Sequence, residues 1–244
     1  MKANSECVRQ YTVKNYESDF GQELKPSFLL GYFQEAAVAH SEEMGMGFGT
    51  LRGQGRFWVL SKIWVELSAR PHCGEDVSVR TRPHEPNKAI YERSFFLEDA
   101  AGVCIARALS RWCVLDAEGR IVPTAQVPHA EMELLGERAL SECDWRIGEA
   151  AVQGAPAFSL RIANSEYDLN GHVSNIKYAD YIFNCFSVEE LRARRIRSFG
   201  LHFVKQSYEG DRLEFYRTET AQGVFLVTGK RGAETVVAAK VCFD

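Results

Sequence analysis

The feature that most constrains the fold is a pattern that occurs twice, in which an apolar helix is followed by four strand-like segments. The first helix is predicted over residues 26–44, and its strands follow at 56–68, 76–82, 89–99 and 103–116. The pattern returns with a helix over about 172–186 and strands at 199–207, 211–220, 223–231 and 234–243. Strands in succession behind one helix favour an antiparallel sheet wrapped around that helix. The chain is therefore predicted to be α+β, with two tandem copies of this unit.

Both predicted helices carry the signature of burial. Pro26 suits a first helical turn, and Gly45 ends the periodic pattern. The second helix is apolar over much of its circumference, which is typical of a helix enclosed by the protein. Its apolar positions are Val173, Ile176, Ala179, Ile182, Phe183 and Phe186. One continuous sheet, or two sheets side by side, would enclose the pair.

The segment between the two copies has a different character. Pro123, Pro128 and Pro156 punctuate it, and "AEMELLGERALSE" (130–142) is polar and predicted to be helical. We interpret this segment as a linker. The predicted division is an N-terminal domain over 1–128, a linker over 129–156 and a C-terminal domain over 157–244.

Composition excludes several classes of protein. The chain of 244 residues is 45% hydrophobic and 25% charged, as in ordinary globular domains, and its net charge of −4 does not indicate nucleic acid binding. Seven scattered cysteines without a CxxC pair indicate reduced thiols rather than a zinc or redox site. The first thirty residues lack a secretory pattern, and no long uncharged apolar run occurs. We expect a cytoplasmic, bacterial protein.

The stretch "YDLNGHVSNIKYADY" (167–181) carries the candidate chemistry. It places Asp168, Asn170 and His172 at alternate positions ahead of the second helix, with Asn175 three residues later. Asp and Asn before an apolar run are common helix caps. The same groups can also act as base or nucleophile, orienting amide and proton relay, while free N–H groups around Val173 to Asn175 stabilise an oxyanion. The two readings are compatible, because a cap fixes side chains in place.

The same stretch resembles the D-x-N-x-H-V-x-N-x-K-Y motif of the acyl–acyl-carrier-protein thioesterases. The segments "FQEAAVAHSEEMG", "FWVLSKIWVEL" and "IYERSFFLEDAAG" are similar to that family's N-terminal half, so the resemblance covers about 10–243. It implies a double hotdog fold and hydrolysis of fatty acyl thioesters on acyl carrier protein, without cofactor or metal. It also implies that Asp168, Asn170 and His172 are catalytic, with Asn175 in support.

One departure from the family motif leaves alternatives open. The family has Glu followed by Cys in the strand after the motif, where this chain has Gln206 and Ser207, with Glu209 nearby. We expect Gln206 and Ser207 to support the site or the oxyanion. A thioesterase for coenzyme A esters would use the same motif. A non-catalytic acyl-binding protein is the alternative that the missing carboxylate favours.

The first copy is expected to supply the acyl pocket. No Asp-x-Asn precedes its helix, since "SFLLGY" (27–32) occupies that place, and His40 is interpreted as structural. The candidate pocket residues are Phe28, Leu29, Tyr32, Phe33, Trp58 and Trp64.

A basic cluster provides a candidate docking site for an acidic carrier protein. It consists of Arg192, Arg194, Arg195 and Arg197, and we expect it beside the tunnel mouth, where it would steer the carrier. The alternative is a solvated helix face that pairs with Glu189 and Glu190. A monomer and a homodimer are both compatible with two fused copies.

Overall fold

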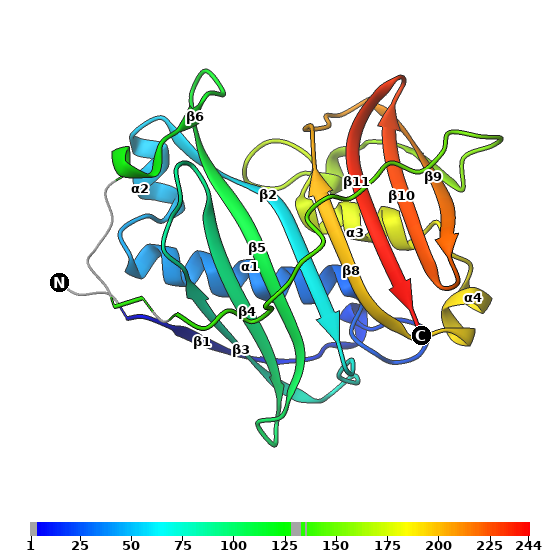
Figure 1. Cartoon of the computed structure of the whole chain (residues 1–244), viewed down its shortest axis with the longest axis horizontal. Helices are drawn as coiled ribbons and strands as arrows, with labels where there is room; N and C mark the ends of the chain where they lie inside the picture. Colours follow the sequence, from blue (N-terminus) through cyan, green and yellow to red (C-terminus); the bar gives the residue numbers. More distant parts are fainter. Residues whose placement is uncertain (1–3, 128–132, 135) are drawn as a thin grey trace.

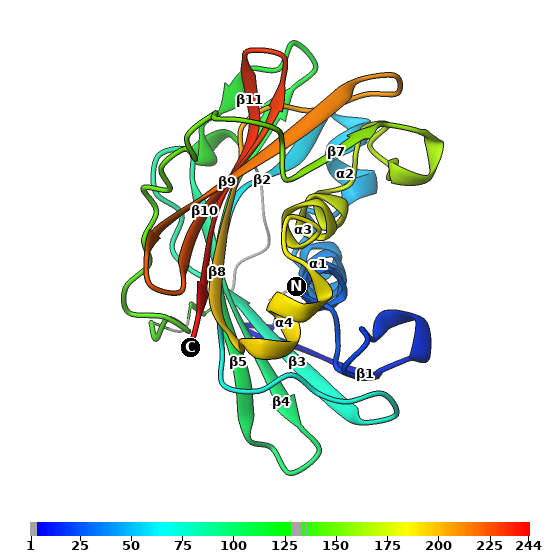
Figure 2. The same ribbon diagram turned by 90° about the vertical axis from the view of Figure 1, so that its right-hand side faces the viewer.

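One antiparallel sheet of eleven strands curves around two helices in the computed structural model, which describes residues 4–127, 133–134 and 136–244 (Figures 1 and 2). The strand order is β1-β3-β4-β5-β2-β8-β11-β10-β9-β7, and β6 pairs with β5. From the central β2–β8 pair outward, the order is equivalent in both directions. The structure is thus the double hotdog expected from the sequence, with one continuous sheet.

The first copy is called the N-lobe and the second the C-lobe. The N-lobe contains β1 (Cys7–Thr12), α1 (Pro26–Glu43), α2 (Phe48–Gly53), β2 (Arg56–Leu67), β3 (Asp76–Pro83), β4 (Tyr91–Asp99), β5 (Cys104–Asp116) and β6 (Ile121–Val122). The C-lobe contains β7 (Phe158–Arg161), α3 (Asn175–Phe183), α4 (Val188–Ala193), β8 (Ile196–Phe203), β9 (Arg212–Ala221), β10 (Val224–Arg231) and β11 (Glu234–Phe243).

Three predicted elements differ from the structure. The second helix is shorter than 172–186, because Val173 donates its N–H to the Ser207 carbonyl (3.1 Å) and forms an isolated β-bridge with Tyr167. The strand predicted at 199–207 is β8, which begins at Ile196 and ends at Phe203. The helix predicted at 130–142 is wrong for residues 133–134 and 136–142, which form no helix; its other residues lie outside the described part. The short edge strands β1 and β7 were not predicted.

From residue 136 onward, the segment between the lobes crosses the outer face of the sheet, opposite the helices (Figure 1). Ala139 and Leu140 are buried there against Trp64, and Lys62 donates to the Trp145 carbonyl (2.8 Å). Trp64 therefore faces away from α1. The division of the chain at 128 and 156 stays a prediction.

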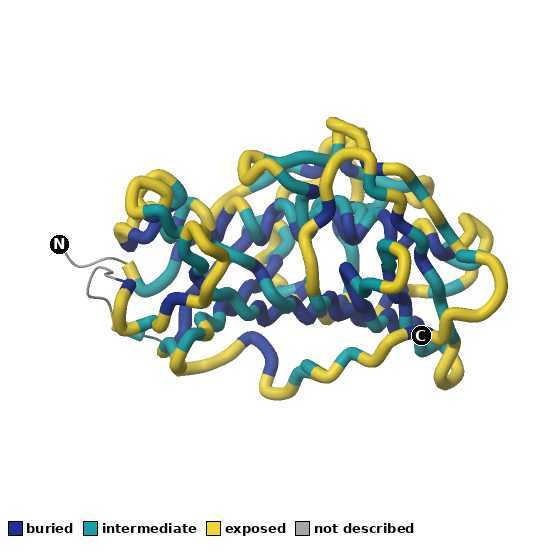
Figure 3. The backbone as a smooth tube through the Cα atoms, turned by 90° about the horizontal axis from the view of Figure 1, so that it is seen from above, coloured by how far each residue is buried: buried dark blue, intermediate teal, exposed yellow. Residues whose placement is uncertain are grey.

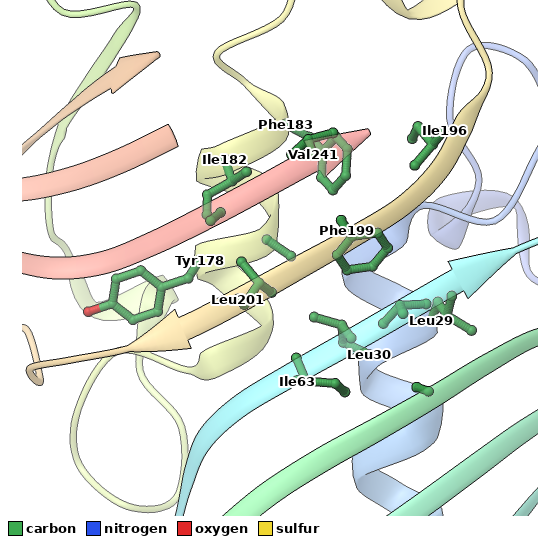
Figure 4. Close-up of a cluster of buried hydrophobic side chains, with 14 of the residues drawn as sticks. Leu29, Leu30, Ile63, Tyr178, Ile182, Phe183, Ile196, Phe199, Leu201 and Val241 are labelled. Carbon is green, nitrogen blue, oxygen red and sulfur yellow. The ribbon is translucent and has the colours of Figure 1, made fainter. Parts of the chain in front are cut away.

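A single hydrophobic core spans both lobes where β2 meets β8. Figure 4 shows Leu29 and Leu30 of α1 beside Ile63, and Ile182 of α3 beside Leu201. Buried residues follow both helices in Figure 3. The two helices are in contact where Gly31 of α1 faces α3: a Cβ at Gly31 would lie 3.5 Å from Ile176 Cδ1, an ordinary van der Waals distance. This packing places the N-terminus of α3 against α1.

Candidate active site

The Asp168 motif forms a tight turn ahead of α3. Asp168 donates its N–H to the His172 carbonyl (3.0 Å) and accepts one from Gly171 (3.1 Å). Its Oδ1 accepts the Asn170 N–H (2.8 Å), so Asn170 holds the carboxylate through its backbone rather than its amide. Gly171 has φ +78°, a conformation that favours glycine. The turn fixes Asp168 and His172 relative to each other.

His172 is the motif side chain placed for proton transfer. Its Nδ1 lies 3.1 Å from the Val173 carbonyl oxygen and 4.0 Å from Asp168 Oδ1. A neutral ring that donates from Nδ1 carries its lone pair on Nε2. The ring lines a large cavity, whereas Asp168 does not. The carboxylate therefore lies behind the imidazole, where it can stabilise a positive charge on the ring.

The backbone around the start of α3 offers fewer donors than the sequence led us to expect. Val173 N–H is engaged by Ser207, and Ser174 N–H donates to the Glu166 carbonyl (2.8 Å). Within the described residues, the N–H groups of Asn175 and Ile176 have no protein acceptor. These two N–H groups lie at the N-terminus of α3, the positive end of the helix dipole, where an oxyanion would be stabilised.

Gln206 and Ser207 have different positions. Gln206 lines the cavity, and its Oε1 accepts a hydrogen bond from the Tyr208 hydroxyl (2.6 Å). Ser207 is buried outside the cavity wall, and its Oγ accepts one from the Tyr178 hydroxyl (2.8 Å). Ser207 thus ties the loop after β8 to α3. Glu209 is exposed and does not line the cavity, so it does not replace the absent carboxylate.

The cavity joins the motif to the N-lobe and has a volume of about 500 Å³. Asn170, His172, Asn175 and Gln206 line it in the C-lobe. Its N-lobe wall is largely apolar and includes Met44, Met46, Phe48, Trp58, Tyr91 and Trp112. A chamber with polar groups beside an apolar wall suits a ligand that has a reactive polar group and a hydrocarbon chain.

Most of the predicted pocket residues do not line this cavity. Trp58 does, but Leu29 and Tyr32 are buried in the core, Phe28 packs against it and Trp64 lies on the outer face. Phe33 lines only a smaller cavity of about 10 Å³. The prediction favoured bulky apolar side chains, which pack into the core and leave no room for a ligand beside them.

The face of α1 that does line the cavity was missed. It consists of Gln34, Ala37, Val38 and Ser41, spaced i, i+3, i+4 and i+7. Two of these side chains are small, and their spacing could have revealed a helix face that leaves room for a ligand.

A buried cation, Arg93, also lies at the cavity wall. Its Nη1 is 3.1 Å from His40 Nδ1 and 3.3 Å from Thr81 Oγ1, and no described carboxylate forms a salt bridge with it. Burial lowers the pKa of Arg93 to about 10. His40 is fully buried, and its Nε2 lies 2.8 Å from the Asn4 carbonyl oxygen. This agrees with the structural interpretation of His40.

The N-lobe contains a copy of the motif turn. Asp19 donates its N–H to the Glu23 carbonyl (2.9 Å), and Asp19 Oδ1 accepts the Gly21 N–H (2.8 Å). The equivalent segment therefore begins at residue 19, and the placement of the equivalent at 27–32 was wrong. Asp19 corresponds to Asp168 and Glu23 to His172.

Arg70 forms ion pairs with both acidic side chains of this second turn. The Leu24 N–H donates to the Pro71 carbonyl, as the Val173 N–H donates to the Ser207 carbonyl. Pro71 therefore corresponds to Ser207, and the preceding residue, Arg70, corresponds to Gln206. The Arg70 guanidinium lies 2.6 Å from Asp19 Oδ2 and also pairs with Glu23. This copy has an ion-paired carboxylate and no imidazole, so it lacks a base like that of the C-lobe.

The arginine cluster was predicted beside the tunnel mouth, but none of its four residues lines the cavity. The motif precedes the N-terminus of α3, whereas α4 and the arginines follow its C-terminus (Figures 1 and 2). Arg194 lies 3.9 Å from Glu219 and Arg197 lies 3.7 Å from Asp244. Arg192 stacks over the Phe20 ring, and Arg195 donates to the Ser68 carbonyl. Glu190 pairs with Arg217 instead.

Within the described ranges, no three His, Cys, Asp or Glu side chains gather as a metal site would require. No described helix combines the length and apolar character needed to cross a membrane.

Two family models match this chain over most of its length. The acyl-ACP thioesterase N-terminal domain matches residues 5–129, and the acyl-ACP thioesterase C-terminal domain matches residues 153–241. The chain belongs to the acyl-ACP thioesterase family. The motif turn, the cavity and the continuous sheet are therefore features of a member of that family.

Solved and curated relatives agree with this assignment. An acyl-ACP thioesterase from Bacteroides thetaiotaomicron is 28% identical, with a TM-score of 0.88 over 98% of each chain. The 12:0-ACP thioesterase of Umbellularia californica shares the fold, with 18% identity and a TM-score of 0.82 over 98% of this chain and 97% of that one. The chloroplastic acyl-(acyl-carrier-protein) hydrolase FATB3 of Cuphea viscosissima is 21% identical over 84% of this chain. The chain spans about half the length of such curated plant relatives, 53% in this case.

Proposed function

We propose that this protein hydrolyses fatty acyl thioesters of acyl carrier protein to free fatty acid and holo-carrier. The observation that carries the proposal is that His172 lines the same cavity of about 500 Å³ as the apolar N-lobe wall. A thioester at the motif would place its acyl chain along that wall. Membership of the acyl-ACP thioesterase family supports the same reaction.

In the proposed mechanism, His172 Nε2 removes a proton from a water molecule that attacks the thioester carbon. Asp168 acts as a positioning residue, because its carboxylate stabilises the imidazolium from behind and does not reach the cavity wall. The free N–H groups of Asn175 and Ile176 stabilise the oxyanion. The C–S bond then breaks, and the thiolate takes the proton from His172. Asn170 and Gln206 orient the water and the thioester from the wall.

The test measures free fatty acid released from a panel of acyl carrier protein thioesters and the matching coenzyme A esters. We expect release from the carrier substrates, and a loss of about 100-fold or more in His172→Ala, as for removal of a general base. Asp168→Asn should also lose activity. Asp19→Asn is its matched control, because it changes the same position of the equivalent turn outside the cavity.

The outcomes distinguish three functions. Faster hydrolysis of the coenzyme A esters would show that coenzyme A, rather than acyl carrier protein, carries the substrate. Tight binding of acyl carrier protein without release from either substrate would contradict hydrolysis. It would indicate an acyl-binding protein, as the presence of Gln206 in place of the family's Glu suggests.

A further inference from the structure

Gln34 of α1 is a polar side chain in the cavity wall. It follows the buried Phe33 and precedes Ala36 and Ala37 on the face toward the core. Its amide forms no hydrogen bond with any described residue, whereas Ser41 on the same face donates to the Val38 carbonyl (2.8 Å). A half-buried amide without a partner is costly unless water or a ligand satisfies it. Gln34 therefore has donors available for a bound molecule.

The position of Gln34 brings it to the motif from the opposite lobe. It lines both the large cavity and the smaller one, and so does Asn175 at the start of α3. The two helices meet where Gly31 faces Ile176, and Gln34 is one helical turn beyond Gly31. Gln34 and Asn175 thus both lie where the two cavities adjoin, and His172 lines the large cavity as well.

We infer that Gln34 is a catalytic residue whose side-chain N–H donates to the thioester carbonyl oxygen. The inference rests on the proposed function. The oxygen would lie between this amide and the free N–H groups of Asn175 and Ile176, so each lobe supplies part of the oxyanion site. Gln34 transfers no proton. It strengthens one hydrogen bond as negative charge develops on the oxygen, which lowers the barrier more than it tightens substrate binding. The N-lobe then contributes to the reaction as well as to the acyl pocket.

The experiment compares kcat and KM of the wild type, Gln34→Met and Gln34→Glu on a carrier substrate that the wild type hydrolyses. Met retains the length of the side chain without a donor, and Glu retains its shape without the N–H₂ group. We expect kcat to fall about 100-fold in both, with KM unchanged, as when one oxyanion donor is removed. The matched control is Glu35→Met, which changes the neighbouring exposed residue outside the cavity and should keep the wild-type kcat. Thermal unfolding checks that each variant is folded.

Each result bears on one proposal. Wild-type kcat in folded Gln34→Met, or a rise in KM alone, would overturn the role of Gln34 and leave the proposed hydrolysis intact. Loss of kcat in Met but not in Glu, at a pH where Glu is ionised, would also overturn it, because a carboxylate lacks the donor too. Absence of turnover by the wild type on every substrate would overturn the proposed function, and this inference with it.

Discussion

His172 and Glu23 occupy the same place in two nearly identical turns, and this one difference gives the lobes different chemistry. In both turns the aspartate Oδ1 accepts a hydrogen bond of 2.8 Å from the backbone N–H two residues later. Only the C-lobe turn presents an imidazole to the cavity, and its aspartate is free of a guanidinium at the position of Gln206. The N-cap residues, Lys25 of α1 and Ser174 of α3, make no side-chain capping hydrogen bond, so the structure does not support the cap interpretation of the turn. Only the C-lobe turn has chemical groups for hydrolysis.

An acidic and a basic replacement of Gln206 should shift the pH dependence of the reaction in opposite directions. Gln206→Glu adds an anion near His172, which favours the protonated ring, so the acid limb of the pH–rate profile should move to higher pH by roughly one unit. Gln206→Arg reproduces Arg70 and should move the limb to lower pH, with lower kcat because the guanidinium competes for Asp168. Identical profiles for both variants would show that this side chain does not influence the base.

Acid should destabilise the protein through its buried histidines. Burial lowers the pKa of His40 and of His84 from the ordinary value of 6.5. Because the unfolded state then binds more protons, the stabilisation is fully present above about pH 6.5 and is lost as pH falls through the lower folded-state pKa. Urea unfolding at several pH values should show this loss, with a shallower slope in His40→Gln. The exposed His72→Gln should keep the wild-type slope.

At the scale of elements, a β-bulge determines which tryptophan reaches the cavity. Trp58 and Trp64 are an even number of residues apart, so regular alternation would place both on one face of β2. The register shifts between Leu60 and Lys62, which reverses the alternation. Trp58 therefore lines the cavity, while Trp64 packs beneath the linker segment.

Replacement of Gly200 should destabilise the β2–β8 junction. It pairs with Trp64, and a Cβ at this position would overlap the indole ring. Gly200→Ala should therefore lower the free energy of unfolding by about 1–3 kcal/mol, as overpacking does. Gly49→Ala in α2 is the control, because a Cβ there meets no atom within 4 Å and should stabilise the helix by up to about 1 kcal/mol. Denaturant unfolding measures both, and equal stability of Gly200→Ala and the wild type would contradict the packing argument.

At the scale of the whole molecule, α3 separates the motif from the arginine cluster. Nine residues at 1.5 Å each make the helix about 13 Å long, which exceeds the screening length of about 8 Å at physiological salt. The cluster is also engaged by other residues, since Arg195 donates to the Ser68 carbonyl of the N-lobe and Arg194 lies 3.9 Å from Glu219 of the C-lobe. Arg192 and Arg195 thus contact the N-lobe, at Phe20 and Ser68.

Charge reversal tests whether the cluster also binds the carrier. Arg194→Glu with Arg195→Glu should change kcat/KM equally for carrier and coenzyme A substrates, because the charges lie far from the motif. Lys205→Glu should weaken carrier substrates more, since Lys205 is exposed and lines the cavity. Selective loss of carrier substrates in the arginine variant would instead restore the docking site that the sequence predicted.

The sequence by itself determined the two-copy fold, the motif turn and the family, because helical period, strand alternation and turn residues act over short stretches of chain. The tertiary structure decided the rest. The bulge in β2 turned Trp64 outward, and helix packing brought Gln34 to Asn175 across more than a hundred residues of chain. The pairing of Val173 with Ser207 shortened the helix and engaged an N–H donor that the sequence left free. Cavities and their walls form where long-range packing leaves space, and local patterns do not encode where that space remains.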